Sequence, residues 1–224
     1  MDTFQKEIAN AVGSCNAFLD LGAGNCRKAS QLFNSIKPRQ YHTLGISKEF
    51  LEAAVADLQI QFPHIEMYAH SIDLSPNVTF PDFGNLRKIF FFPGSSVGNY
   101  DPDEAVSFFS NLANQCNGNG GLLVGVDLIK DVKTLDIAYN DARSITAAFN
   151  RNALNNVNRL IGSNFNPANW EHYAFFNESK SRIEMYLRAI ADVKVTISGS
   201  GSKDSVLNFK VGDLIHTENS YKYT

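Results

Sequence analysis

The chain has 224 residues, of which 44% are hydrophobic and 19% are charged, and its formal net charge is −3. This composition is typical of a globular protein with a sizeable core and excludes disordered and fibrous classes. The slight acidity does not favour nucleic acid or an anionic membrane as a partner, and no apolar run approaches the ~20 residues of a membrane span.

Three cysteines, Cys15, Cys26 and Cys116, are widely spaced. They indicate free thiols in a reducing cytoplasm, and there is no CxxC pair that would suggest a metal site. The five histidines show no HxxxH spacing, so no metal is expected.

Short apolar runs alternate with helical patterns over residues 1–131. The runs that predict strands are 17–21, 41–44, 65–69, 88–92 and 122–128. Helices are predicted at 27–36, from an N-cap at Ser47 to residue 62, and from Asp101 to just before Gly118. Because the strands are apolar throughout rather than alternating, they indicate a parallel sheet with helices on both faces.

From residue 132 onward the pattern changes. Residues 132–160 predict one or two long helices, and 182–190, 192–198 and 206–210 predict antiparallel strands, with a Gly/Ser hairpin turn at 199–202. We therefore expect an α/β part over residues 1–131 and an α+β part over 132–224, together forming one compact unit.

A glycine loop, Gly22-Ala23-Gly24, follows the first predicted strand, whose end carries Asp20. Glycines at this point let the backbone approach a ligand closely, and the next helix offers free N–H groups. The loop lacks the GxGxxG spacing of a dinucleotide site. It suits a ligand with an amino-acid tail, such as S-adenosylmethionine, although a plain tight turn is also compatible with it.

A second polar loop, PGSSVGNY, follows the fourth predicted strand, and Asp73 follows the third. In doubly wound sheets ligands lie beyond the carboxyl ends of the strands, so this loop is a good site candidate. Asp73 could accept a hydrogen bond from an adenine amino group, or could be a solvated loop acid.

The same loop matches the nucleophile elbow of serine hydrolases, with Ser96 as nucleophile and Asp127 and then His172 or His216 in hydrolase order. The elbow requires a helix that begins at the serine. Since Pro102 and its acidic neighbours place the helix start several residues later, the hydrolase is the less favoured alternative.

Further candidates lie in the second part of the chain. Asp141 is expected on a solvated helix face, and Tyr139 in the core with its hydroxyl at a site. Met185 is expected in the core, because it lies in an alternating strand. Glu218 and Ser220 form either a polar cluster beside aromatic residues or a simple polar tail.

Several stretches then read together: LDLGAGNCRK, FFPGSSVGN, LLVGVDLIKD, AYNDARSITAAFNRN, RIEM and HTENSYKYT. They resemble the histidine-specific S-adenosylmethionine methyltransferase family, which includes the histidine Nα-methyltransferases of ergothioneine biosynthesis. The resemblance covers residues 17–224. It implies a class I methyltransferase fold, with a Rossmann-like parallel sheet and an α+β substrate domain, and an enzyme that methylates the α-amine of histidine or a related small amino acid or amine.

The resemblance also implies residue roles. S-adenosylmethionine would be bound by Gly22, Gly24, Lys28, Asp73, Leu74, Gly94 and Ser95. The substrate would be bound by Asn99, Tyr139, Met185, Glu218 and Ser220. Asn99 and Tyr139, the proposed catalytic pair, would fix its α-amino and carboxylate end, Glu218 and Ser220 would hydrogen-bond the imidazole, and Met185 would line that pocket.

Three features depart from the family pattern. Gly45 stands where the family has an acid that binds the ribose hydroxyls. The family also carries substrate-binding tyrosines before the first strand, but none of the 16 residues before Ala17 is a tyrosine. The last helix and two strands expected of a class I sheet are missing after SYKYT. The chain would be a fragment or short form, or a partner would fill the gap, so a homodimer through an open sheet edge is one possibility. The alternative function is a degenerate methyltransferase fold that acts as a binding or interaction module.

Overall fold

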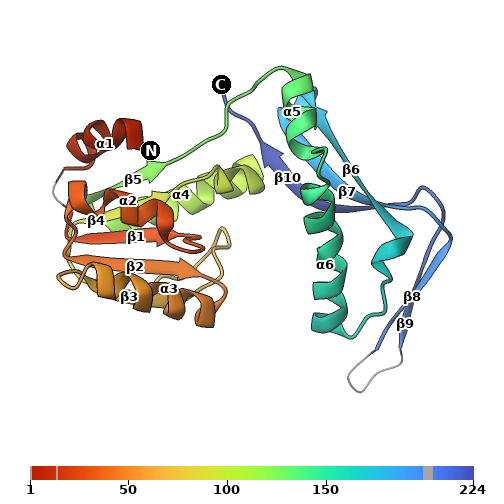
Figure 1. The fold of residues 1–224 in the computed structure, drawn as a ribbon, viewed down its shortest axis with the longest axis horizontal. Helices are drawn as coiled ribbons and strands as arrows, with labels where there is room; N and C mark the ends of the chain where they lie inside the picture. The colour runs from red at the N-terminus through yellow and green to blue at the C-terminus, as the bar shows by residue number, and fades with distance from the viewer. Residues whose placement is uncertain (1, 14, 199–203) are drawn as a thin grey trace. The chain divides into compact units, whose positions relative to one another are not determined.

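The computed structural model describes residues 2–13, 15–198 and 204–224 (Figure 1). The chain divides into two compact units, residues 1–127 and 128–224. Among the described residues, no helix has both the length and the apolar character needed to cross a membrane.

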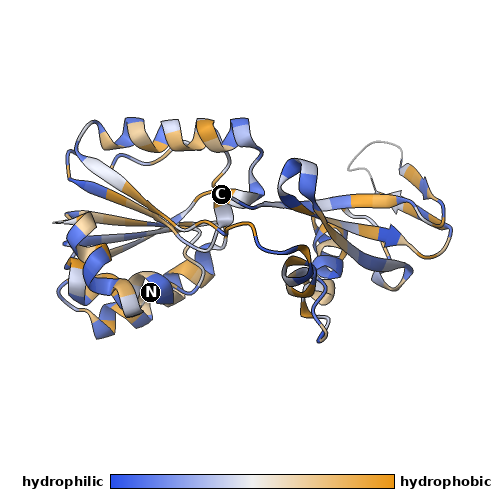
Figure 2. Ribbon diagram, turned by 90° about the horizontal axis from the view of Figure 1, so that it is seen from above, coloured by the Kyte–Doolittle hydropathy of each residue, from blue (hydrophilic) through white to orange (hydrophobic). Residues whose placement is uncertain are grey.

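The first unit is built on a five-stranded parallel sheet in the order β3-β2-β1-β4-β5. Its strands are β1 (Ala17–Leu21), β2 (Gln40–Gly45), β3 (Glu66–Ser71), β4 (Lys88–Phe92) and β5 (Gly120–Val124). Its α-helices are α1 (Gln5–Val12), α2 (Arg27–Ile36), α3 (Lys48–Gln61) and α4 (Pro102–Cys116). The helices lie on both faces of the sheet (Figure 2), which confirms the predicted α/β class.

Aromatic side chains fill the core beneath α2. Phe18 of β1 stacks on Phe91 of β4 with ring centroids 5.3 Å apart, and Phe33 of α2 meets Tyr41 of β2 edge-on at 4.9 Å. All residues of β1 and β4 are buried. Continuous apolar strands are stable only where helices cover both faces, so the pattern and the layering explain each other.

Helix α4 begins as its sequence predicts. The Asp101 backbone N–H donates to Glu104 Oε2 at 2.9 Å in a capping box, and Pro102 occupies the first turn. Ser47 occupies the N-cap position of α3 as expected, but its side chain makes no capping hydrogen bond. The position of that helix start therefore follows from the apolar pattern rather than from the serine.

Two predictions in this unit need correction. The strand expected at 122–128 is β5, which begins earlier and ends at Val124. Gly125 still donates its N–H to Phe92 O of β4 at 3.0 Å, and its backbone passes against Pro93 and Gly94. Helix α1 was not predicted, since only Ile8, Ala9 and Val12 of its eight residues pack against the core.

The second unit has two α-helices and two antiparallel sheets. The helices are α5 (Val132–Tyr139) and α6 (Ile145–Ile161). One sheet contains β6 (Trp170–Asn177), β7 (Arg182–Ala189) and β10 (Leu214–Tyr221) in the order β10-β7-β6, and the other pairs β8 (Val193–Ile197) with β9 (Ser205–Phe209). The predicted turn at 199–202 lies outside the described residues. The predicted helices and the strands β7, β8 and β9 are confirmed.

Strands β6 and β10 were missed. Strand β10 has the sequence LIHTENSY, in which polar residues fall on both faces and hide the period of two. Its polar side chains are accommodated by hydrogen bonds to distant partners, which no local pattern reports. The interpretation of residues 216–224 as a polar tail is therefore wrong: most of the segment is a strand paired with β7.

The core of the first unit predicts a specific stability effect. Leu32 of α2 is fully buried in the cluster that contains Phe18 and Tyr41, whereas Asn34 on the same helix is exposed. Leu32→Ala should lower the free energy of unfolding by about 2–5 kcal/mol, because it leaves a cavity. Urea unfolding of Leu32→Ala and the control Asn34→Ala measures this, and equal midpoints would contradict the described packing.

Candidate functional site

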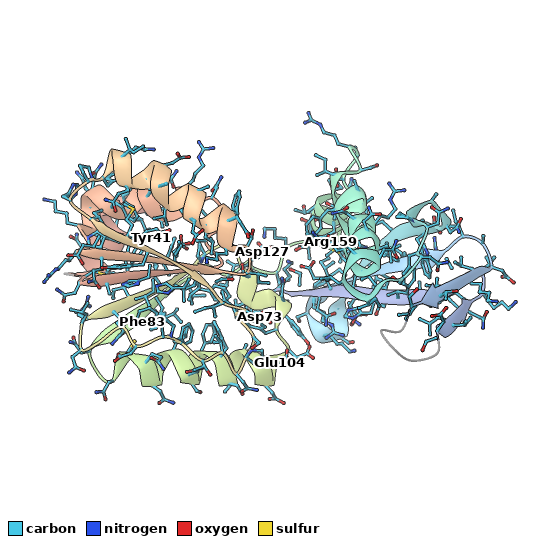
Figure 3. All side chains as sticks on the ribbon, turned by 90° about the horizontal axis from the view of Figure 1, so that it is seen from below. Tyr41, Asp73, Phe83, Glu104, Asp127 and Arg159 are labelled. Carbon is cyan, nitrogen blue, oxygen red and sulfur yellow. The ribbon has the colours of Figure 1, made fainter. Side chains whose placement is uncertain are left out.

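The parallel strands of the first unit end at one edge of the sheet, and the predicted cofactor residues follow them. Gly22 and Gly24 come after β1, Asp73 after β3, and Gly94 after β4. Asp73 and Asp127 lie at the same end of the sheet (Figure 3). The structure thus gathers these residues at the carboxyl edge, where open parallel sheets bind ligands.

The loop after β1 has the backbone that its glycines permit. Gly22 has φ +69° and Gly24 has φ +54°, a left-handed conformation that costs glycine little. The Gly22 N–H donates to Leu44 O at 2.9 Å, and a Cβ on Gly22 would lie 3.9 Å from Cδ1 of Leu74. Two residues predicted to hold the cofactor, from the loops after β1 and β3, are therefore neighbours.

The loop after β4 approaches helix α2. Gly94 has φ +80°, and a Cβ there would lie 2.8 Å from Nζ of Lys28, so no other side chain fits without displacing the lysine. Lys28 and Gly94 also line a cavity of about 440 Å³ together with Phe91 and Leu123. This brings two further predicted cofactor residues together.

Ser95 and Asn99 shape the rest of this loop. Ser95 has φ +61°, its N–H donates to Gly125 O at 2.9 Å, and its Oγ accepts a hydrogen bond from the Asp127 N–H at 2.9 Å. Asn99 ends the 3₁₀ helix Ser96–Asn99 that follows. The hydroxyl of Ser95 thus ties the loop after β4 to the chain beyond β5.

Asp73 and Leu74 are tied to Tyr100. The Tyr100 hydroxyl donates to the Leu74 carbonyl. Burial, together with the charges of Asp73 and Glu104, raises the pKa of Tyr100 to about 12. The phenol therefore keeps its proton and fixes the backbone that presents Asp73.

Asp20 is a buried acid that sequence analysis quoted only as the end of the first strand. It is 1% exposed, and its Oδ2 accepts a hydrogen bond from the Tyr41 hydroxyl at 2.8 Å. Among the described residues its Oδ1 has no hydrogen-bond partner. Burial raises the pKa of Asp20 to about 7, despite the opposing effects of Tyr41 and of the nearby Lys28 charge. The sequence signal was an acid inside an apolar strand.

The second unit gathers the predicted substrate residues that it contains. The Tyr139 hydroxyl, at the end of α5, donates to Ser220 Oγ at 2.8 Å. Met185 is 4% exposed in the cluster against which Tyr139 packs, and Glu218 pairs with Met185 across β10 and β7. Lys222, which sequence analysis did not single out, donates to both Tyr139 and Ser220.

The backbone of Tyr139 is held by a histidine with a defined tautomer. Asn150 Nδ2 donates to Nδ1 of His172 at 2.9 Å, so the ring proton must be on Nε2, which lies 2.9 Å from Tyr139 O. His172 therefore positions the end of α5 with both ring nitrogens engaged.

The serine-hydrolase alternative is not supported by this geometry. Ser96 opens a 3₁₀ helix, and α4 begins only at Pro102, so the strand-to-helix turn of a nucleophile elbow is not formed. His172 is used as described, and Nε2 of His216 lies 2.9 Å from Oδ1 of Asn219. The chemistry expected of that motif has no structural basis here.

Asp141 is partly exposed, as predicted, but it lies between α5 and α6 rather than on a helix face. Its carboxylate accepts hydrogen bonds from the backbone N–H groups of Thr146 and Ile145, at 2.8 and 2.9 Å. These bonds lower the pKa of Asp141 to about 2. Asp141 therefore satisfies the free N–H groups at the start of α6.

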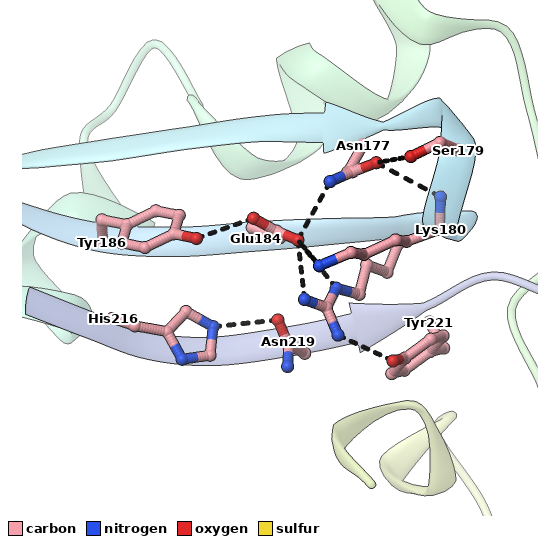
Figure 4. A network of polar contacts seen from close by, with 9 residues as sticks. Asn177, Ser179, Lys180, Glu184, Tyr186, His216, Asn219 and Tyr221 are labelled. Atoms are coloured by element: carbon pink, nitrogen blue, oxygen red, sulfur yellow. Dashed lines mark hydrogen bonds and ion pairs between the residues drawn. The ribbon is translucent and has the colours of Figure 1, made fainter. Parts of the chain in front are cut away.

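The face of β7 opposite Met185 carries a polar network centred on Glu184 (Figure 4). Glu184 is 4% exposed and lies 2.7 Å from both the Tyr186 hydroxyl and Nη2 of Arg182. Burial alone would raise the pKa of Glu184, but the bonds from Tyr186 and Arg182 lower it overall. This network orders the sheet face that the predicted substrate residues do not use.

The buried Asp20 predicts a pH-dependent stability. Because its pKa is raised from 3.8 to about 7, the folded state keeps a proton that the unfolded chain releases between those pH values. Stability from this group is present at low pH and is lost as the pH rises through 7, by at most about 1.4 kcal/mol per pH unit. Asp20→Asn should remove this slope in denaturant titrations from pH 4 to 8. The exposed Asp57→Asn should keep it, and parallel profiles for wild type and Asp20→Asn would refute the assignment.

Comparisons with known proteins identify a family and similar enzymes. The family described as "Histidine-specific methyltransferase, SAM-dependent" matches residues 1–224. The chain is 33% identical to a histidine N-alpha-methyltransferase of Mycolicibacterium smegmatis, covering 99% of this chain and 68% of that protein. It is 31% identical to the histidine N-alpha-methyltransferase of Mycobacterium tuberculosis, covering 99% and 70%.

Among solved structures, an S-adenosylmethionine-dependent methyltransferase from Clostridium acetobutylicum matches 99% of this chain and 72% of that chain, with 12% identity and a TM-score of 0.45. The family match confirms the resemblance seen in the sequence motifs, and with it the expected cofactor and class of enzyme. The chain belongs to the histidine-specific, S-adenosylmethionine-dependent methyltransferase family.

Proposed function

We propose that this protein transfers a methyl group from S-adenosylmethionine to the α-amine of histidine. The observation that carries the proposal is the 2.8 Å contact between the Tyr139 and Ser220 hydroxyls, 81 residues apart in the sequence. Tyr139 was predicted to hold the amino-acid end of the substrate and Ser220 its imidazole. Their contact brings together two residues that were predicted to bind the same substrate.

The carboxyl edge of the first unit fits the cofactor. Left-handed glycines keep side chains away from the tips of β1 and β4. The buried Oδ1 of Asp20, which has no hydrogen-bond partner among the described residues, is a polar atom that a bound ligand could satisfy. The residues proposed to hold S-adenosylmethionine are Gly22, Gly24, Lys28, Asp73, Leu74, Gly94 and Ser95. When bound, the cofactor supplies a methyl group on a sulfonium, which is a good leaving group.

The chain's own residues then have to hold the acceptor nitrogen with its lone pair free. The Asn99 amide and the Tyr139 phenol are proposed to fix the α-amino and carboxylate end. Glu218, a hydrogen-bond acceptor, and Ser220 are proposed to bind the imidazole beside Met185. Positioning of this kind can supply much of the rate enhancement, because it replaces a bimolecular encounter by a held geometry.

A second candidate function has one observation in its favour. Gly45 ends β2 at the carboxyl edge, where the family pattern has an acid for the ribose hydroxyls. A weakened cofactor site would fit a protein that keeps the fold and acts as a binding module. Cofactor binding without methyl transfer to any amino acid would favour this alternative.

The proposal predicts the product of a direct assay. Purified protein incubated with S-adenosylmethionine and histidine should yield histidine methylated on the α-nitrogen, located by fragmentation in mass spectrometry. Leucine should yield no methylated product, because it has no imidazole for Glu218 and Ser220. A protein that binds S-adenosylhomocysteine but leaves histidine unmodified would contradict the proposed reaction.

Gly45 predicts a gain in cofactor affinity. A Cβ there would lie 3.6 Å from Cδ1 of Leu51, an ordinary contact, so a side chain can be added without displacing a neighbour. Gly45→Asp should lower the Kd for S-adenosylhomocysteine about tenfold or more, because a carboxylate can accept hydrogen bonds from ribose hydroxyls. Gly45→Ala, which adds the Cβ alone, should leave the Kd unchanged. Equal affinities for both variants would show that the tip of β2 does not meet the ribose.

A further inference from the structure

Two histidines on neighbouring strands of the first unit are in direct contact, and the proposed function does not use them. Nδ1 of His42, on β2, lies 3.0 Å from Nε2 of His70, on the edge strand β3. His42 is only 6% exposed. The Tyr68 ring stacks on the His42 ring at 4.8 Å, and Phe83, between β3 and β4, packs edge-on against both imidazoles at 5.0 and 5.7 Å. The pair therefore lies among aromatic rings at the edge of the sheet.

The hydrogen-bond directions around this pair follow from Glu66. Its carboxylate can only accept, so the Gln40 amide N–H donates to it at 2.8 Å. The Gln40 carbonyl oxygen, 3.3 Å from Nε2 of His42, then accepts from that nitrogen. A neutral His42 therefore carries its proton on Nε2 and accepts at Nδ1, so Nε2 of His70 must be the donor in the contact between the rings.

This contact limits the number of protons that the pair can hold. Two facing nitrogens share one proton while they are in contact, whereas separated rings bind a proton at each nitrogen. Nδ1 of His70, which has no hydrogen-bond partner among the described residues, can take up a proton without disturbing the contact. A further proton would set two N–H donors against each other. The closed pair therefore holds at most one positive charge, whereas separated histidines hold two.

The surroundings of the rings act in the same direction. Burial, together with the charge of His70, lowers the pKa of His42 to about 4, although the charge of Glu66 opposes this shift. Burial also lowers the pKa of His70. A folded-state pKa below the ordinary value means that the folded pair binds protons less readily than separated histidines do.

The other charged and titratable groups near the pair each have partners of their own. Glu66 is exposed, accepts from the Tyr68 hydroxyl at 3.3 Å, and lies 3.8 Å from Arg39. Two charged groups beside the Phe83 segment bond to the Gly84 backbone, Asp82 at 2.7 Å and Lys88 at 2.6 Å. The carboxylate that opposes the pKa shift at His42 is therefore a solvated one, which cannot hold a second positive charge in the closed pair.

We propose that the contact between His42 and His70 is a pH-sensitive latch, which holds the edge strand β3 on the sheet and opens on acidification. Strand β3 has a neighbouring strand on one side only. The Ile72 N–H, directly after β3, donates to the end of β2 at 2.8 Å, and Asp73 and Leu74 follow. When both histidines take up protons, their contact breaks, and β3 separates from β2 with the loop after it. The inference rests on the proposed function only in assigning Asp73 and Leu74 to the cofactor.

The latch predicts that β3 opens with uptake of a proton. Histidines in the open form bind protons near pH 6.5, so the latch is stable above that pH and weakens as the pH falls toward 4. Hydrogen exchange measures this local opening as the protection factor of the Ile72 amide relative to those of the central strand β1. The relative protection of Ile72 should fall about 10- to 30-fold from pH 7 to pH 5.

Two variants remove the second histidine while keeping a side chain that can make the contact. Glutamine can donate or accept at either position, so His42→Gln and His70→Gln each leave one histidine that the closed form can protonate. Both variants should abolish the pH dependence at Ile72. His64→Gln removes an exposed histidine just before β3 and should match wild type. Saturating S-adenosylhomocysteine should restore the protection of wild-type Ile72 at pH 5, because it binds the closed form.

The latch is overturned if the relative protection of Ile72 in wild type changes by less than about threefold, or if the pH dependence persists in His70→Gln. If neither glutamine variant folds, NMR titration of the wild-type imidazoles decides the matter. Uptake of a single proton by the pair above pH 5 supports the latch, and two independent protonations near pH 6.5 overturn it.

The link to the cofactor has its own outcome. S-adenosylhomocysteine that binds without restoring the protection of Ile72 would overturn this link. Absence of binding, or of histidine methylation, would instead overturn the proposed function. Exchange in the unliganded protein depends on neither, so the two failures are distinguishable.

Discussion

Backbone crowding at the carboxyl edge of the five-stranded sheet is the constraint on which the cofactor half of the site depends. A Cβ on Gly125 would lie 3.2 Å from the Gly94 backbone nitrogen, whereas a Cβ on Gly94 would meet the flexible end of Lys28, 2.8 Å from Nζ. The loops after β4 and β5 can pass this closely because Gly125 lacks a side chain. Gly22, which also lacks a side chain, lies beside Leu74. Backbone N–H and C=O groups lie at this edge together with the side chains of Lys28, Asp73 and Asp127, a combination suited to a small polar ligand.

The second unit holds polar side chains on both faces of the β10-β7-β6 sheet. Residues of β7 alternate between the two faces of its sheet. Met185 lies on the same face as Ser220, and Glu184 lies on the opposite face. On the face of Met185, the buried Lys222 ammonium donates hydrogen bonds to the hydroxyls of Tyr139 and Ser220. His172 holds the Tyr139 backbone through its carbonyl oxygen. On the second face a buried carboxylate is surrounded by donors. These bonds satisfy Ser220, Lys222 and Glu184, whereas Nε1 of the buried Trp170, on the same face as Met185, has no hydrogen-bond partner among the described residues.

Sequence patterns predicted those parts of the fold that local chemistry determines. Strands β1 and β4 and helix α2 have the predicted bounds, because a continuous apolar run or a helical period identifies them directly. Strand β10 was missed since its buried polar residues are stabilised by partners far away in the chain. For the same reason the sequence motifs indicated Tyr139 and Ser220 separately. Their contact, and the hydrogen bonds that Lys222 donates to both, could be found only from the structure. Asp20 was not predicted as a site residue. The lack of a hydrogen-bond partner for its Oδ1 among the described residues depends on three-dimensional packing, which residue spacing in the sequence does not report.

The claim that side-chain-free strand tips form the cofactor site is tested most directly by titration calorimetry with S-adenosylhomocysteine on wild type, Gly94→Ala and Gly118→Ala. Both glycines have positive φ, but a Cβ on Gly118 meets nothing within 4 Å. The account predicts that wild type and Gly118→Ala bind alike and that Gly94→Ala binds at least about tenfold more weakly. Absence of binding to wild type, or equal affinity in Gly94→Ala and Gly118→Ala, would contradict it.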